Sequence, residues 1–207
     1  LTESQLPILD RLKQRPDDSF KRDILTEVQY EKFWKYLRHK YCAKKHNKDI
    51  DNAELLKRKI FTEFIMIIAN VGFRSKELLG LKVGEISEGE GWDAKKKKSH
   101  IVMKVRKENS KTGKGRLCVA PVRERVEKVI KHYKDLGIKL DKSDYLFMNP
   151  TSKTRKNYGR MIMYKRLKKV FNDSGLQKEF DAENKLVSIY SFRHQYACWR
   201  LRFGDVP

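Results

Sequence analysis

One stretch constrains the fold more than any other, because residues 53–71 are apolar on nearly every side of a helix. The large apolar side chains of its second half are Ile60, Phe61, Phe64, Ile65, Ile67, Ile68 and Val71. A helix without a polar face is buried on all sides in a globular protein. Gly72 follows as a stop signal. We therefore expect this helix at the centre of the domain, with the other elements packed around it.

Other segments carry apolar residues at helical spacing, and their caps and breakers set the expected limits. These are a capping box at Thr26 and Gln29, the short segment SKELLGL after Gly72, Pro121 to a stop at Gly137, residues 157–174 before Gly175, and Ser191 to Gly204. Most of the chain is therefore expected to be helical.

The apolar period changes to two at residues 100–105. Ile101, Met103 and Val105 alternate there with polar residues, and Leu117 and Val119 follow after the turn-rich segment NSKTGKG. This pattern predicts a β-hairpin in which Leu117 and Val119 answer the apolar face of the first strand. The expected fold class is α+β, mainly helical, with a small antiparallel β-sheet.

The charge indicates a polyanionic partner. Lys and Arg number 48 and Asp and Glu 27, so the net charge is +21. Nucleic acid is the expected ligand of such a folded, basic domain, although charge alone does not separate DNA from RNA. The basic residues are spread over many elements, which disfavours a membrane surface. No apolar run approaches the roughly 18 residues that a membrane span needs.

The cysteines indicate a reducing compartment. Cys42, Cys118 and Cys198 are odd in number and far apart, so we expect no disulfide framework. His39, Cys42 and His46 lie close together, but zinc requires a fourth ligand and usually a tighter spacing. We interpret them as part of a polar helix end, and we expect neither a metal nor a cofactor.

Three positions carry candidate chemistry. Arg74 precedes a helix, where backbone N–H groups also favour an anion, and Glu77 is placed to hold its guanidinium in a bidentate pair. A surface ion pair of little energetic value is the alternative. Lys111 lies in the hairpin turn. There its ammonium group could reach a phosphate, and the alternative is that the turn is merely basic and exposed. The segment lacks the GxxxxGK[ST] spacing of a nucleotide-binding loop.

Arg193, in YSFRH, opens the last helix. Its neighbours Tyr196, Ala197, Trp199 and Leu201 are interpreted as core residues. An arginine among them is partly buried and requires an anion, because burying an unpaired charge is costly. That anion is either a structural carboxylate or a bound phosphate.

The order of these three positions resembles the catalytic domain of the tyrosine recombinases, the phage-integrase family, over roughly residues 24–207. Arg74, Glu77 and Leu78 match a TGxRxxEL-like motif, Lys111 matches the hairpin lysine, Arg193 and His194 match HxxRH, and RLCVAPV resembles the hairpin exit. Tyr190 stands where the family has the histidine of HxxR.

The resemblance implies a chemistry and a set of site residues. In the family a tyrosine attacks a phosphodiester and forms a 3′-phosphotyrosine link without metal or ATP. The implied catalytic residues are Arg74, Lys111, Tyr190 and Arg193, supported by Glu77 and His194, with Lys114, Arg116, Arg155 and Lys156 as DNA-binding residues. Arg74 and Arg193 would stabilise charge on the phosphate, and Lys111 would protonate the leaving oxygen.

The nucleophile of the family lies a few dozen residues beyond the second arginine, and only 14 residues follow Arg193. We therefore expect residues 25–207 to be a recombinase catalytic domain without its C-terminal end. Residues 1–24 are expected to be a linker or the tail of a missing N-terminal DNA-binding domain. Such a fragment is expected not to cleave DNA by itself.

The expected partner is double-stranded DNA, bound by a tetramer of the full protein in the cytoplasm, at the nucleoid or in a host cell. Two alternatives remain open. One is a DNA-binding protein with the same fold and no catalysis, favoured by Tyr190 and the absent nucleophile. The other is an RNA-binding domain, which the charge alone supports.

Overall fold

The computed structural model describes residues 23–88 and 100–202, while residues 1–22, 89–99 and 203–207 lie outside the description. The expected linker at residues 1–24 therefore lies almost wholly outside it. The helices are α1 (Glu27–Tyr36), α2 (Asn52–Val71), α3 (Ser75–Leu79), α4 (Arg123–Lys134), α5 (Arg160–Asp173), α6 (Leu176–Ala182) and α7 (Ile189–Arg202). The strands are β1 (Ile86–Ser87), β2 (Ile101–Val105) and β3 (Arg116–Ala120).

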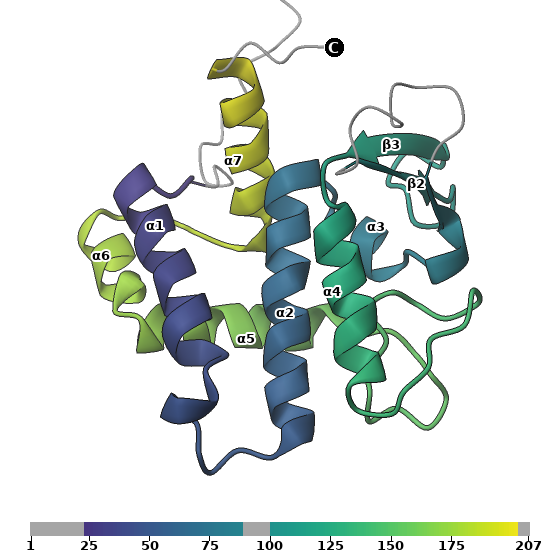
Figure 1. Cartoon of the computed structure of the whole chain (residues 1–207). Helices are drawn as coiled ribbons and strands as arrows, with labels where there is room; N and C mark the ends of the chain where they lie inside the picture. Colours follow the sequence, from purple (N-terminus) through teal and green to yellow (C-terminus); the bar gives the residue numbers. More distant parts are fainter. Residues whose placement is uncertain (1–22, 89–99, 203–207) are drawn as a thin grey trace, which may run out of the picture.

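The apolar helix lies at the centre, as its sequence predicts. α2 packs against α4 and α7, and Figure 1 shows it upright between α1 and α4, with α5 behind. The Asp51 side chain caps its first turn by accepting a hydrogen bond from the Glu54 N–H. Gly72 ends it in the left-handed conformation, at φ +69°. The predicted position and the end of this helix are confirmed, and it begins one residue earlier than predicted, at Asn52.

The predicted hairpin is also confirmed, but the buried face of its second strand differs from the prediction. The three strands form an antiparallel sheet in the order β1-β2-β3, and Met103 lies opposite Cys118. Directly opposed residues share a face, so Cys118 points inward with Met103. Leu117 and Val119 therefore lie on the outer face, where they are 68% and 41% exposed. The prediction that they share the apolar face of the first strand is wrong, because the register places Arg116, Cys118 and Ala120 on that face instead.

The helical predictions hold in outline and differ at the ends. The capping box is present, since the Gln29 N–H donates to Thr26 Oγ1 at 3.2 Å and the Thr26 N–H to Gln29 Oε1 at 3.1 Å. The helix expected from Pro121 begins at Arg123, and α6 was not predicted at all. Gly175 stands in the left-handed conformation between α5 and α6, at φ +76°.

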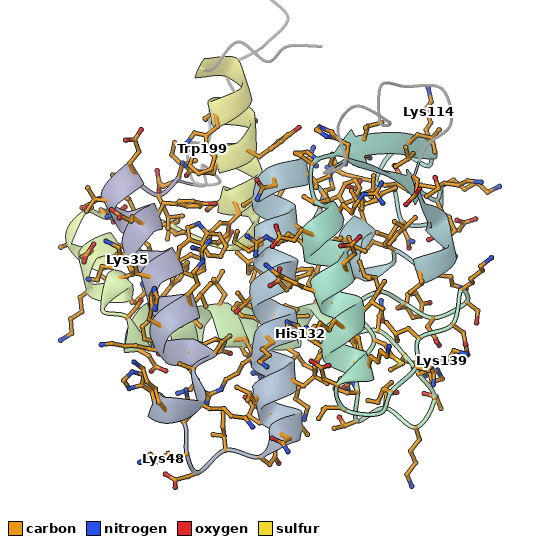
Figure 2. All side chains as sticks on the ribbon, viewed as in Figure 1. Lys35, Lys48, Lys114, His132, Lys139 and Trp199 are labelled. Carbon is orange, nitrogen blue, oxygen red and sulfur yellow. The ribbon has the colours of Figure 1, made fainter. Side chains whose placement is uncertain are left out.

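The last helix begins at Ile189, and its buried face is not the one predicted. Ile189 and Phe192 are its buried apolar residues, whereas Ala197 is exposed. Trp199, which Figure 2 labels on α7, is half-buried. Its ring meets the Tyr30 ring edge-on, with the ring centres 4.6 Å apart. The interpretation of the later apolar residues as core is therefore wrong for Ala197 and only partly right for Tyr196 and Trp199, and the Leu201 side chain lies outside the description.

Within the described residues, no helix combines the length and the apolarity that a membrane crossing requires.

Candidate functional site

The candidate site lies where three distant parts of the chain meet at one end of the domain. The turn from α2 to α3 carries Arg74, the beginning of β3 carries Arg116, and the second turn of α7 carries Arg193. Figure 1 shows α7 and the sheet at the same end of α2. The three guanidinium groups converge on one carboxylate, that of Glu77 in α3.

Glu77 is the buried centre of this cluster. Its side chain has no exposed surface. Oε1 accepts hydrogen bonds from Arg74 Nη1 at 3.1 Å and from Arg116 Nη1 at 3.0 Å. Oε2 accepts from the Arg74 backbone N–H at 2.8 Å and from Arg116 Nη2, also at 2.8 Å. A buried carboxylate needs such partners, and here both oxygens have two.

The predicted bidentate pair exists with a different arginine. Glu77 forms it with Arg116, not with Arg74. Arg74 is the residue that precedes the first turn of α3, so its own N–H already occupies Oε2 and leaves its side chain a single contact with Oε1. Ser75 could be expected as the cap of this helix from its residue type, but it is the first helical residue and Arg74 holds the cap position.

Arg193 reaches the cluster from α7. Its Nη1 donates to the carbonyl oxygen of Gly72 and lies 4.0 Å from Glu77 Oε2. Its side chain is 28% exposed, close to the 31% of Arg74, which agrees with the predicted partial burial. Tyr196, one turn later, lies over Gly72, where any Cβ would come within 2.4 Å of its ring. Glycine at position 72 is therefore required both for the turn and for the approach of α7.

The electrostatics keep the carboxylate ionised and the cluster positive. Burial of Glu77 opposes ionisation, but the hydrogen bonds from Arg116 and Arg74 outweigh it, so the pKa of Glu77 is lowered. The hydrogen bonds to Glu77 raise the pKa of Arg116 in turn. One negative charge therefore faces three positive charges. Arg74 and Arg193, whose side chains are 31% and 28% exposed, can present this excess to an anion.

Two aromatic side chains stand on the exposed face of α7 beside Arg193. Tyr190 is 39% exposed, and its ring meets the exposed His194 ring edge-on at 4.7 Å. The two residues are one helical turn apart, which places their side chains next to each other on the helix surface.

The hairpin turn carries two exposed lysines, Lys111 and Lys114, and Figure 2 places Lys114 at the outer end of the sheet. Neither lysine side chain forms a hydrogen bond or an ion pair with another described residue. A shallow groove of about 540 Å³ lies where the strands β2 and β3 meet the turn, and Glu108 is its acidic lining residue. Its basic lining residues are Lys104, Arg106, Lys107 and Arg116. This side of the sheet presents positive charge without fixed partners at the turn.

The structure does not bring Arg155 and Lys156 to this cluster. Arg155 forms a bidentate pair with Asp144 and also donates to the carbonyl oxygen of Lys139. Figure 2 shows Lys139 well below the hairpin lysine. Arg155 adopts a left-handed backbone conformation, at φ +52°, which this pair helps to hold. Lys156 is exposed on the same loop.

Among the three residues weighed as zinc ligands, Cys42 has another partner. Cys42 Sγ lies 3.2 Å from Thr62 Oγ1, and burial raises the pKa of its thiol. The described part of the chain contains no group of three or more potential ligands with the geometry of a metal site.

Sequence reasoning did not identify the pairing of Arg116 with Glu77 or the use of the Gly72 carbonyl by Arg193. One signal for the first was present. Arg116 alternates along β3 with the small residues Cys118 and Ala120, so these three side chains lie on one face. The apolar residues Leu117 and Val119 lie on the other face.

Comparisons with known proteins place the fold. Neither a family model nor a curated protein matches the chain. Solved structures do match: the XerH site-specific recombinase bound to difH substrate in a pre-cleavage complex has a TM-score of 0.60 at 18% identity over 90% of this chain. The XerA recombinase has a TM-score of 0.53 at 19% identity over 92%. The post-cleavage complex of XerH with palindromic difH has 0.54 at 17% over 88%.

These matches cover 45%, 53% and 43% of the respective recombinase chains, so this chain spans about half of their length. The shared fold is the mainly helical one with a small antiparallel sheet that tyrosine recombinase catalytic domains have, and the predicted fold class is confirmed.

Proposed function

We propose that this chain is the phosphate-binding part of a tyrosine recombinase, which cuts and rejoins double-stranded DNA. The observation that carries the proposal is the convergence of Arg74 and Arg193 on one buried carboxylate, on a fold shared with recombinases crystallised on DNA. Two half-exposed guanidinium groups with excess positive charge suit the single negative charge of a phosphodiester.

In this proposal the arginines act mainly on the transition state. Charge builds up on the non-bridging oxygens while the phosphodiester is attacked, and donors aimed at these oxygens lower the barrier. Arg74 and Arg193 come from α2–α3 and α7, two separate parts of the fold, so they can contact one phosphate from two directions. Their support by Glu77 and Gly72 limits their motion, which favours a preorganised site.

The other predicted residues take the following roles in the proposal. Lys111, on the exposed turn, protonates the leaving 5′-oxygen. Tyr190 donates a hydrogen bond to a phosphate oxygen in place of the family's histidine, and His194 supports it through their ring contact. Lys114 and Lys156 bind the DNA backbone. Arg155 also binds it, while its guanidinium stays paired with Asp144. Such contacts make binding weaken steeply as salt rises.

The nucleophile belongs to the same proposal. No tyrosine among the described residues is assigned this role, and Tyr196 is held over Gly72. We place the nucleophilic tyrosine in a longer protein, after residue 207, and an N-terminal DNA-binding domain before residue 25. The matched recombinases are about twice as long, which supports a protein of that size. The active form is proposed to be a tetramer on two duplexes, in the cytoplasm of the host cell.

A second candidate is a DNA-binding protein that uses the same fold without catalysis. Tyr190 favours it, because it stands where the family has the histidine of HxxR, and a phenol is a poor general base near neutral pH. Competition between duplex DNA and structured RNA at one salt concentration separates both candidates from an RNA-binding role.

The experiment uses the longer protein and a library of random-sequence DNA duplexes, from which covalent protein–DNA adducts are isolated under denaturing conditions. We expect Arg74→Ala and Arg193→Ala to abolish the adduct while changing duplex affinity by no more than a few fold, because these residues act on the reacting phosphate. Arg123→Ala is the matched control, since this arginine is similarly buried at 24% exposure and pairs with Glu88.

If the unaltered protein forms adducts and both arginine variants form them as well, the catalytic assignment is excluded. A collapse of duplex affinity in the same variants would make Arg74 and Arg193 binding residues. The absence of any adduct, with duplex binding intact, would favour the second candidate.

A further inference from the structure

Arg116 is held more firmly than the other two arginines of the cluster. Both of its terminal nitrogens donate to Glu77, at 3.0 and 2.8 Å. Its guanidinium carbon also lies 5.7 Å from the centre of the Phe73 ring, in a cation–π contact. Its backbone opens β3 opposite Val105. The Arg116 guanidinium is therefore held by its place on β3, by the Phe73 ring and by the Glu77 carboxylate. A side chain held in this way is better suited to support the site than to adjust to a ligand.

The hydrogen bonds to Glu77 reach the capacity of its carboxylate. An ionised carboxylate has about four acceptor positions. Arg116 occupies one on each oxygen, the Arg74 side chain takes the second on Oε1, and the Arg74 N–H takes the second on Oε2. No position remains for Arg193, which lies 4.0 Å away and donates to Gly72 instead.

This saturation determines how much of Arg74 and Arg193 is available to a ligand. With Arg116 in place, Arg74 has only one side-chain contact with Glu77, through Nη1. Without Arg116, two acceptor positions would open beside the guanidinium groups of Arg74 and Arg193. Arg74 or Arg193 would then close on Glu77, because a bidentate pair with a buried carboxylate is the strongest contact in reach.

We propose that Arg116 is a positioning residue that saturates and neutralises Glu77, and thereby keeps Arg74 and Arg193 available for a DNA phosphate. This inference rests on the proposed function. It changes the sequence-based assignment of Arg116 as a DNA-binding residue. The charge of Arg116 compensates the Glu77 carboxylate of the protein instead of a phosphate of the DNA.

The test measures binding of inorganic phosphate to the chain of residues 1–207 by NMR. The Nε–Hε signals of Arg74, Arg116 and Arg193 are followed at mildly acidic pH, where these protons exchange slowly. In the unaltered chain we expect phosphate to shift the signals of Arg74 and Arg193 more than that of Arg116.

Three variants separate the roles. Arg116→Met is expected to bind phosphate about tenfold more weakly, the loss of roughly one charge-assisted contact. Lys104→Met is the matched control, because it removes one charge from the same groove and is expected to stay within about twofold of the unaltered chain. Arg116→Met combined with Glu77→Gln is expected to recover most of the affinity, since the charge that captures Arg74 and Arg193 is then absent.

Each other outcome has a definite meaning. Equal affinities of the Arg116→Met and Lys104→Met variants would overturn the inference and leave the proposed function intact. So would a double variant as weak as Arg116→Met alone, which would make Arg116 a direct phosphate ligand. If phosphate shifts neither Arg74 nor Arg193 in the unaltered chain, the phosphate site of the proposed function fails, and the inference fails with it. The double variant also guards against misfolding, because it removes both members of the pair.

Discussion

Replacement of Glu77 by glutamine tests whether the arginine cluster also stabilises the fold. Glutamine has nearly the same shape but carries no charge. Its amide NH2 would replace one of the two oxygens, so that two N–H donors would face each other at that position. Removing one partner of a buried ion pair costs about 3–5 kcal/mol. Arg116 is 38% exposed and can regain water. We therefore expect a loss near the lower end, about 3 kcal/mol of the free energy of unfolding.

The assay is urea unfolding at neutral pH, with Glu88→Gln as the control. Glu88 also pairs with an arginine, Arg123, but its side chain is 82% exposed, so its loss is expected to cost less than about 0.5 kcal/mol. With an m-value of about 3 kcal/mol per molar urea for a chain of this size, Glu77→Gln should lower the midpoint by about 1 M. Glu88→Gln should leave it nearly unchanged.

The pH dependence gives a second criterion. The pKa of Glu77 is lower in the folded than in the unfolded state, so the stabilisation is present above the unfolded pKa of about 4.3 and is lost as pH falls through the folded value. The difference between the unaltered chain and Glu77→Gln should therefore be constant from neutral pH to about pH 5 and shrink below about pH 4. Equal midpoint shifts in Glu77→Gln and Glu88→Gln, or a difference independent of acid, would refute the reasoning.

Two further predictions concern parts of the fold around the site. Gly72→Ala should destabilise the chain by about 1–3 kcal/mol more than Gly113→Ala, as measured by urea unfolding. Both glycines have nearly the same φ, +69° and +68°, but only a Cβ at Gly72 meets Tyr196, at 2.4 Å, so equal losses would contradict the predicted contact. Burial and the charge of Lys59 lower the pKa of His132 from 6.5 to about 4, so an NMR titration of its ring should have its midpoint near that value. The unfolded chain then binds a proton that the folded chain does not between those two pH values, so stability should fall as pH decreases through this range, and a midpoint near 6.5 would exclude this environment.

The centre of the fold could be predicted from the sequence because one physical effect dominates there. Burial of apolar area is roughly additive and non-directional, so a helix that is apolar all round has one stable position, the core. Ile60, Phe61 and Phe64 in α2 are completely buried. The alternation at Ile101, Met103 and Val105 was sufficient for the same reason, since a strand with one apolar face has only one way to face the core.

The second strand of the hairpin could not be predicted in this way because two effects compete there. Apolar pattern alone places Leu117 and Val119 inside, yet they are exposed, and Arg116 shares the inner face with Cys118. The register allows this arrangement because Glu77, 39 positions earlier in the chain, accepts both ends of the Arg116 guanidinium. A charge pair between distant residues thus outweighs the burial of two apolar side chains on a short strand at the sheet edge.

The same limit explains why the candidate site was predicted only in part. Arg74 and Arg193 could be identified because each lies in a local motif, but the contact that brings Arg193 to the turn before Arg74 spans 121 positions. Local motifs also suggest that Arg74 and Glu77 pair closely, whereas the structure shows Arg116 in the bidentate position. Which arginine donates to the carboxylate with both nitrogens depends on how distant parts of the chain pack together. The spacing of residues along the chain does not reveal this. The number of acceptor positions on one buried carboxylate, and not the number of arginines near it, therefore determines how much positive charge this site can present to a phosphate.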